Sequence, residues 1–227
     1  MKDKKISVAI DGPSGAGKST VAKALAKEFC LIYVDTGAIY RTVGLAAQRA
    51  GIASKDAEGV IALLPELKIE IAYDSEGTQR MLLGNEDVSD EIRTPLSSIY
   101  ASDVSALPEV RAFLMDMQRS MAEKHSVVMD GRDIGTVVLP KADIKIFLTA
   151  SAEERARRRY LELQQRGSTA TFAEVLRDIE YRDLQDSTRS AAPLKPAPDA
   201  VFIDSSRLTF AESVEAAAKL IRRKLEE

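Results

Sequence analysis

The sequence lacks several features that define whole classes of proteins. It has one cysteine, Cys30, so no disulfide bond can form within the chain, and its place at a predicted helix end indicates a buried, inert thiol. It has one histidine, His125, which precedes a predicted strand and which we interpret as structural or solvated. Its N-terminal apolar run is too short for a signal peptide or a membrane span, so we expect a cytoplasmic protein without a membrane partner.

An excess of positive charge is also missing. The net charge is −3 over 227 residues, which argues against a nucleic-acid polymer as the main partner, although a local basic site is compatible with it. The composition that remains, with 45% hydrophobic and 30% charged residues, is ordinary for a soluble globular protein. The length suffices for one large domain with a sizeable core, and we assign residues 1–227 to a single domain.

The strongest motif is a glycine-rich loop near the N-terminus. Residues 12–19 read GPSGAGKS and fit the phosphate-binding pattern GxxxxGK[ST], between a short apolar run and a helical stretch. A glycine-rich turn without a ligand is the alternative. If the loop binds a nucleotide, Lys18 reaches the β- and γ-phosphates of ATP and Ser19 ligates Mg²⁺. We expect ATP to be bound by this loop and the residue after it: Gly12, Pro13, Ser14, Gly15, Ala16, Gly17, Lys18, Ser19 and Thr20.

Apolar runs and helical stretches alternate along most of the chain. The alternation predicts an α/β fold, a five-stranded parallel sheet with helices on both faces. Asp35 or Thr36 is expected to cap the second helix, and Ser151 to form a capping box with Glu154. The expected strands are 6–10, 31–34, 127–130, 144–148 and 200–203, and the expected helices are 19–29, 36–51, 56–64, 95–106, 109–124, 151–166, 172–185 and 209–225.

One segment departs from this alternation. Between residues 65 and 90, apolar and polar side chains alternate with a period of two, and glycine turns separate the runs. This pattern predicts a small antiparallel β insert with one face in water. A structural decoration and a role in covering the substrate are equally compatible with it.

Charged side chains follow the strands at the edge where parallel sheets bind ligands. DTG follows the second strand and DGRD, residues 130–133, follows the third. The arginines exceed what one nucleotide requires, so we expect a phosphorylated acceptor, whose charge forked guanidinium groups offset best. Such an acceptor is largely dianionic at neutral pH and needs no catalytic base. The fourth strand leads into further arginines: Arg155, Arg157, Arg158, Arg159 and Arg166.

The arginine-rich helix has two interpretations. Charge runs on helices are usually solvated faces, but Arg157, Arg158 and Arg159 are adjacent and cannot all share one face with Glu153 and Glu154. We expect one or two of them to reach over the phosphates from a lid that shuts out water.

Taken together, these segments resemble the bacterial cytidylate kinases. The resemblance rests on GPSGAGKS, DTGAIYR (35–41), DGRDIGTVV (130–138), ERARRR (154–159) and RDLQDSTR (182–189), and it covers nearly the whole chain, including the insert and EIRTP (91–95). It implies transfer of the γ-phosphoryl group of ATP to CMP or dCMP, giving CDP or dCDP and ADP, with Mg²⁺. We expect ATP and CMP or dCMP as the partners, and a monomer.

The resemblance also implies a division of the chain and a set of roles. It divides the chain into a core (1–34, 126–150 and 190–227), a monophosphate-binding region of about 35–125 and a lid of about 155–168. Lys18, Arg132, Arg157 and Arg159 are the catalytic candidates. Thr36 stands where the family pattern has serine, and it keeps the hydroxyl. The implied CMP-binding residues are Thr36, Gly37, Tyr40, Arg41, Ser102, Arg111, Arg132, Asp133, Arg182, Asp186 and Arg189.

Two assignments within this site need separate arguments. Cytosine offers an exocyclic amine that a carboxylate accepts, whereas uracil presents a carbonyl oxygen, so Asp133 favours cytosine. Its alternative role is an ion pair with Arg132 or Arg111 that orients them. For Mg²⁺ the candidates are Ser19 with either Asp35 or Asp130, and the sequence leaves this choice open.

Two other functions are compatible with the motifs. One is a kinase of the same fold that acts on another nucleoside monophosphate or on shikimate, which an acceptor screen would identify. The other is a GTPase-like switch, which the lack of an NKxD-like motif and the excess of arginines disfavour.

Overall fold

The computed structural model describes residues 5–165 and 167–227. The chain divides into two compact units, one made of residues 1–31 and 126–227 and the other of residues 32–125. The principal elements are β1 (Ser7–Asp11), α1 (Lys18–Glu28), β2 (Ile32–Asp35), α2 (Thr36–Arg49), α3 (Ala57–Leu63), β3 (Ile69–Tyr73), β4 (Gln79–Leu83), β5 (Glu86–Asp87), α4 (Pro95–Val104), α5 (Pro108–Lys124), β6 (Val127–Gly131), β7 (Ile144–Thr149), α6 (Ala152–Gln165), α7 (Phe172–Thr188), β8 (Val201–Asp204) and α8 (Phe210–Glu226).

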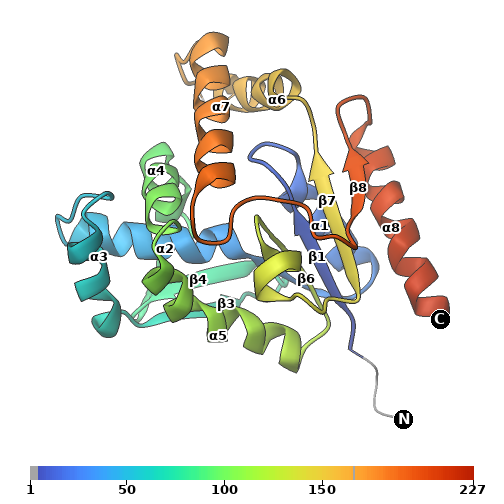
Figure 1. Cartoon of the computed structure of the whole chain (residues 1–227), viewed down its shortest axis with the longest axis horizontal. Helices are drawn as coiled ribbons and strands as arrows, with labels where there is room; N and C mark the ends of the chain where they lie inside the picture. Colours follow the sequence, from blue (N-terminus) through green and yellow to red (C-terminus); the bar gives the residue numbers. More distant parts are fainter. Residues whose placement is uncertain (1–4, 166) are drawn as a thin grey trace. The chain divides into compact units, whose positions relative to one another are not determined.

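The larger sheet has the strand order β2-β6-β1-β7-β8. β6, β1, β7 and β8 are labelled in Figure 1. β1 pairs in parallel with β6 and β7, and β7 pairs in parallel with β8. β6 is buried along its whole length, and β1 is buried beyond its first residue, as strands covered on both faces are. α1 packs against β6 and α8, and α8 also packs against β7 and β8. The predicted α/β architecture with five strands is confirmed.

The second unit contains the predicted antiparallel insert, a sheet with the order β3-β4-β5. Ile71 pairs with Met81 across β3 and β4, and Met81 is buried whereas Glu70 is exposed. The Gln79 side chain accepts a hydrogen bond from the Asp35 amide at 2.7 Å and donates to the Asp35 carbonyl oxygen at 3.2 Å. The insert is therefore anchored to the start of α2.

The prediction that Cys30 is buried was wrong. Cys30 is exposed and has a left-handed backbone conformation with φ of 52°. The chain reverses direction there after α1, and the Leu31 amide donates back to the Ala26 carbonyl oxygen at 2.9 Å. This turn directs Leu31 rather than Cys30 into the core.

Helix caps agree with the sequence at α2 and differ at α6. Asp35 caps α2, since its Oδ1 accepts from the Ala38 amide at 2.9 Å. At α6, Ser151 Oγ accepts from the Glu154 amide at 3.2 Å, but Ser151's own amide donates to Ser206. The predicted capping box is therefore only half formed, because the Glu154 carboxylate binds arginines instead. Complete capping boxes begin α7 and α8, at Thr171–Glu174 and Thr209–Glu212, and were not predicted.

A π-helical turn, Ile134–Val138, follows β6 and was not predicted. It comes directly after the DGRD motif and brings its first amide groups toward the end of β1. Within the described ranges, no helix is long and apolar enough to cross a membrane.

Candidate active site

The phosphate loop lies between the buried strand β1 and helix α1. Gly12, Gly15 and Gly17 have φ angles of 149°, 77° and 88°. A Cβ atom at Gly12 would lie 1.9 Å from the Leu148 carbonyl oxygen of β7, so only glycine fits there. Among the described residues no side chain caps α1, and the amides of its first turn can therefore face an anion.

Lys18 is buried at the start of α1, with 6% of its surface exposed. Its Nζ donates to the Pro13 carbonyl oxygen at 2.8 Å, which folds the side chain back over the loop. Burial, helped by Arg132, lowers the pKa of Lys18 to about 7, and the neighbouring carboxylates of Asp130 and Asp186 oppose that shift. A triphosphate bound in the loop would favour the charged form.

Ser19 and Asp130 meet beside Lys18. The Ser19 hydroxyl donates to Asp130 Oδ2 at 2.8 Å, which joins the first turn of α1 to the end of β6. Hydroxyl and carboxylate oxygens suit Mg²⁺, which also keeps several water ligands and binds substrate phosphates. In the described part of the chain, no group of three or more His, Cys, Asp or Glu side chains is arranged to hold a metal ion.

Asp11, the last residue of β1, is a buried carboxylate that the sequence analysis did not single out. Its two oxygens each accept a backbone hydrogen bond at 2.7 Å, from the amides of Ile134 and Gly135. Burial raises the pKa of Asp11 to about 6, although these two bonds act in the opposite direction. Asp11 thereby fixes the turn that carries Arg132 and Asp133 against the base of the phosphate loop.

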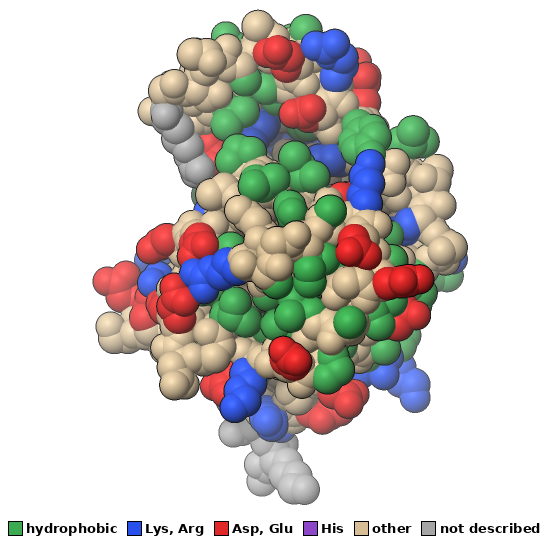
Figure 2. Space-filling view, turned by 90° about the vertical axis from the view of Figure 1, so that its left-hand side faces the viewer, with side chains coloured by type: hydrophobic (Ala, Val, Ile, Leu, Met, Phe, Trp, Pro, Cys, Tyr) green, Lys and Arg blue, Asp and Glu red, His purple; other side chains and the backbone are tan. Residues whose placement is uncertain are grey.

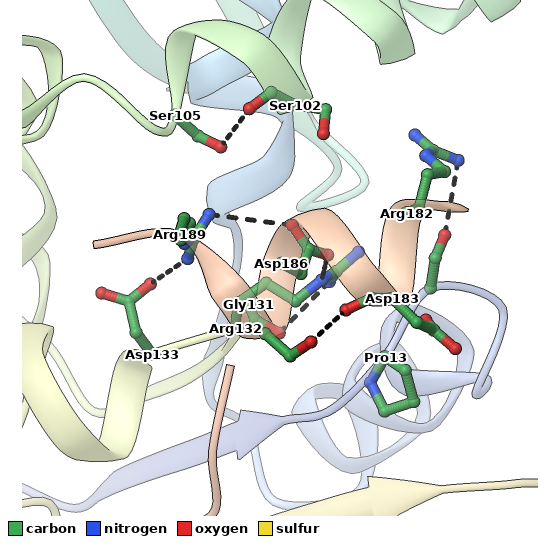
Figure 3. A network of polar contacts seen from close by, with 12 residues as sticks. Pro13, Ser102, Ser105, Gly131, Arg132, Asp133, Arg182, Asp183, Asp186 and Arg189 are labelled. Carbon is green, nitrogen blue, oxygen red and sulfur yellow. Dashed lines mark hydrogen bonds and ion pairs between the residues drawn. The ribbon is translucent and has the colours of Figure 1, made fainter. Parts of the chain in front are cut away.

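Arginines and carboxylates alternate where β6 ends and α7 ends (Figure 3). Arg132 Nε donates to Asp186 Oδ2 at 2.7 Å. Arg189 lies 3.6 Å from Asp133 and 3.8 Å from Asp186. Burial alone would raise the pKa of Asp186, but Arg132, Arg189 and Arg182 hold it below its usual value. Asp186 thus stays ionised and holds the Arg132 guanidinium group in place. Asp133 forms an ion pair with Arg189, a partner that the sequence analysis did not consider beside Arg132 and Arg111.

Two further arginines reach the phosphate loop from the helices after β7. Arg182 of α7 approaches Ser14 Oγ at 3.4 Å. Arg155 of α6 donates to the Ser14 carbonyl oxygen at 3.0 Å and forms a bidentate ion pair with Asp183 of α7. Both helices are therefore connected to the loop through Ser14.

The three adjacent arginines of α6 face different partners. Arg157 pairs with Glu154, and 59% of its side chain is exposed. Arg158 pairs with Glu154 and also donates to Ser205, and its Nη1 lies 3.9 Å from where a Cβ at Gly17 would be. Arg159 pairs with Glu162. Of these three, only Arg158 is held close to the phosphate loop here, and Arg166 lies outside the described residues.

The remaining candidates belong to the unit of residues 32–125. Asp35 Oδ2 accepts from Arg41 Nη2 at 2.9 Å, and a Cβ atom at Gly37 would lie 3.1 Å from each of these side chains. The Arg111 guanidinium lies 5.5 Å from the centre of the Tyr40 ring. Thr36, the first residue of α2, is buried.

A short chain of contacts continues from Arg111. Arg111 Nη1 donates to the Ser105 carbonyl oxygen at 3.2 Å, and Ser105 Oγ donates to the Ser102 carbonyl oxygen at 2.9 Å. Within this unit the structure therefore forms two groups of predicted residues, Asp35 with Arg41, and Tyr40 with Arg111 next to Ser102.

Comparison with known proteins assigns the family. The family model described as "Cytidylate kinase" matches residues 8–223. The chain belongs to the cytidylate kinase family. It is 49% identical to the curated cytidylate kinase of Caldicellulosiruptor saccharolyticus over 96% of both chains, and 51% identical to that of Geobacter sp. strain M21 over 99% of this chain and 96% of the relative. This result confirms the resemblance found in the sequence, and the chain is a kinase.

A solved structure supports the fold separately. An uncharacterized protein from Eubacterium ventriosum superposes with a TM-score of 0.50 at 16% identity, covering 98% of this chain and 99% of the other. At this identity the likeness concerns the fold alone.

The sequence analysis did not identify Asp11 or Asp183 as site residues, and it gave Arg155 no specific role. An acid that ends an apolar strand just before a phosphate loop was the available signal for Asp11. Its partners lie 123 and 124 residues further along the chain, so their identity required the fold. Arg155 and Asp183 stand among many charged helical residues, and only tertiary packing distinguishes them.

Proposed function

We propose that this kinase transfers the γ-phosphoryl group of ATP to CMP and dCMP, producing CDP or dCDP and ADP. The observation that carries the proposal is that the ion-paired group of Arg132, Asp186 and Arg189 lies in the same unit as the phosphate loop. The positive charge of Arg132 also helps to lower the pKa of Lys18 in that loop. The family membership and the names of its relatives support the same acceptor.

The acceptor phosphate brings its own nucleophile. Its second pKa is about 6, so it is largely dianionic at neutral pH and does not depend on a base. What it does need is compensation for the repulsion between two phosphate groups, which forked guanidinium groups supply. We assign this role to Arg132, Arg182 and Arg189, with Arg41 from the other unit. In the structure Asp186 holds the first of them in place.

The ATP side of the reaction depends on α1. Lys18 and the loop amides bind the phosphates and stabilise the charge that develops during in-line transfer. Mg²⁺, when bound, would neutralise part of the charge on the phosphates. We assign its protein contacts to Ser19 and Asp130. Asp35 is the weaker candidate, because one of its oxygens caps α2 and the other binds Arg41.

Asp133 is proposed to recognise the base. It is buried, with 4% of its surface exposed, and its carboxylate can accept a hydrogen bond from the cytosine amine. Uracil would place a carbonyl oxygen against this carboxylate with no proton between them. Ser102 and Arg111 complete the proposed base contacts.

The remaining assignments concern regions and partners. We propose that residues 35–125 bind the monophosphate and that residues 155–168 form the lid, in which Arg157 and Arg159 turn toward the transferred group when it closes. We also propose that the chain acts as a monomer in the cytoplasm and does not act on nucleic-acid polymers. On the face shown in Figure 2, positive and negative side chains are interspersed, which suits a small-molecule enzyme.

A coupled ADP-release assay tests the proposal. Purified protein is given Mg-ATP with CMP, dCMP, UMP, AMP, GMP or dTMP in turn. The expected result is strong turnover with CMP and dCMP and weak turnover with UMP. Equal turnover of UMP and CMP would contradict the role of Asp133. No turnover with any monophosphate would contradict the acceptor class itself.

A further inference from the structure

Arg155, in the first turn of α6, is a buried arginine that contacts three separate segments of its unit. Only 4% of its surface is exposed. Its Nε donates to the Ala150 carbonyl oxygen at 2.8 Å, and its Nη1 donates to the Ser14 carbonyl oxygen at 3.0 Å. Nη1 and Nη2 donate to the two carboxylate oxygens of Asp183 at 3.0 and 2.5 Å. One guanidinium group therefore joins the end of β7, the phosphate loop and α7.

The packing around this arginine leaves little freedom between the loop and the two helices. A Cβ atom at Gly15 would lie 3.2 Å from the Arg155 Cβ and 3.5 Å from the Ile179 Cδ1 of α7. Arg182, next to Asp183, approaches the Ser14 side chain from the same helix. A change in the backbone of Ser14 or Gly15 would therefore directly alter contacts that α6 and α7 make with the loop.

Asp183 shares its helix with the groups assigned to the acceptor. Asp186 lies three residues further along α7, on the same side of the helix, and pairs with Arg132. Arg189 follows at the end of α7 and lies within ion-pair distance of Asp186 and Asp133. α7 thus connects to the loop through Asp183 and Arg155, and to the acceptor group through Asp186, whose pairing with Arg132 is drawn in Figure 3.

We propose that Arg155 and Asp183 are positioning residues that couple occupancy of the phosphate loop to binding of the acceptor nucleotide. This inference rests on the proposed function. Phosphates held by the loop amides fix the Ser14 carbonyl group, and this group orients the planar fork of Arg155 and through it α7. An acceptor that binds next meets an ordered helix and loses less conformational entropy on binding, so its affinity rises.

The test measures this coupling rather than activity. Titration calorimetry gives the Kd of CMP with and without a non-hydrolysable ATP analogue and Mg²⁺, for the wild type, Arg155→Lys, Asp183→Asn and the double variant. Lysine keeps the charge but cannot make the fork. We expect the analogue to tighten CMP binding about tenfold in the wild type, within the usual range of allosteric coupling, and less than about threefold in all three variants.

Arg222→Lys is the matched control. Arg222 on α8 also pairs with two carboxylates, Glu28 and Glu215, but far along the chain from the loop and at the surface. This variant should keep the wild-type coupling. If the two single variants and the double variant lose the coupling to the same extent, Arg155 and Asp183 act together rather than independently.

Several results would overturn the inference. A purely structural ion pair would lower the melting temperature of the variants and leave the coupling factor of the folded protein unchanged. A wild type that phosphorylates CMP but shows no coupling would overturn the inference and leave the proposed function intact. A wild type that phosphorylates no monophosphate would overturn both.

Hydrogen exchange of the wild type keeps the inference testable if the variants do not fold. With the ATP analogue, Mg²⁺ and no CMP, amide protection over Phe172–Thr188 should rise. Unchanged protection of α7 under saturating analogue would contradict the coupling.

Discussion

At the scale of single residues, the ion pair between Asp133 and Arg189 affects which substrate the site can select. Arg189 lies 3.6 Å from Asp133, and both side chains are almost fully buried. A buried carboxylate must be paired or hydrogen-bonded to remain charged. Arg189 supplies that pairing, and the Asp133 carboxylate can accept a hydrogen bond from a bound base.

We predict that Asp133→Ala and Asp133→Asn reduce the preference for CMP over UMP. A site whose buried group is left unpaired by the wrong ligand can discriminate by up to about 10⁴-fold. Alanine removes that penalty, and asparagine can donate to the uracil carbonyl oxygen. The ratio of kcat/KM for CMP to that for UMP should fall about tenfold or more in both variants. The exposed Asp178 of α7 offers the control Asp178→Ala. An unchanged ratio in both Asp133 variants would mean that Asp133 does not recognise the base.

Asp11 leads to a prediction about stability and pH. Its pKa is raised to about 6 from 3.8, so between these values the folded state binds a proton that the unfolded state has released. This contribution to the free energy of unfolding is therefore present at low pH and is lost as the pH rises through about 6. Its full size is about 3 kcal/mol.

Asp11→Asn removes this titration. Asparagine has one acceptor oxygen for two amides, so the variant loses a hydrogen bond at every pH, and the difference between two pH values is the informative quantity. Urea unfolding at pH 5 and pH 8 should show wild-type stability falling by about 1 to 2 kcal/mol more than that of the variant. Parallel changes in both proteins would show that Asp11 is not the group that titrates.

At the scale of the element, the sequence predicted what depends on local pattern. Apolar runs located β1, β6 and β7 because these parallel strands are buried on both faces. An apolar run also located β8, although Val201 and Phe202 are exposed there. A period of two located the insert, since its sheet has one exposed face. The sequence did not locate groups whose role depends on distant partners. Glu154 fits a capping box by spacing, yet its carboxylate binds Arg157 and Arg158.

The phosphate loop and α6 illustrate why spacing alone was insufficient for the site. The motif predicted the loop and Lys18 from eight consecutive residues. It could not predict that Arg155 rather than its neighbours would turn toward Ser14, because successive helical residues differ by about 100° in direction and only packing selects one. Cys30 follows the same rule, since the backbone turn after α1 determines which side chain is buried.

Packing between the loop and α6 can be tested with two glycines of similar conformation. Gly15 and Gly77 have φ angles of 77° and 75°, but a Cβ at Gly77 meets nothing within 4 Å. Gly77→Ala should therefore lower the free energy of unfolding only by the cost of a left-handed backbone at a non-glycine residue, about 1 to 2 kcal/mol. Gly15→Ala should lose about 1 to 3 kcal/mol more, because its methyl group crowds Arg155. Urea unfolding measures both losses, and equal losses would show that α6 moves freely away from the loop.

At the scale of the whole molecule, ligand binding connects the two nucleotide sites to global stability. A ligand that binds only the folded state stabilises it by about 3 kcal/mol at a concentration of 100 times its Kd. For a chain of this length, that corresponds to a rise of several degrees in melting temperature. The rise in melting temperature therefore reports the binding of each nucleotide separately, without turnover.

We predict that Lys18→Ala abolishes most of the rise produced by Mg-ATP and keeps the rise produced by CMP. Lys18 contacts the loop through Pro13, and its charge serves the ATP phosphates, whereas the acceptor is assigned to arginines elsewhere. The kcat should fall by at least about 100-fold, since an interaction with the transferring phosphate is lost. Lys27→Ala, an exposed lysine at the other end of α1, should change neither rise. Loss of the CMP-dependent rise in Lys18→Ala would mean that the acceptor binds where ATP has been placed.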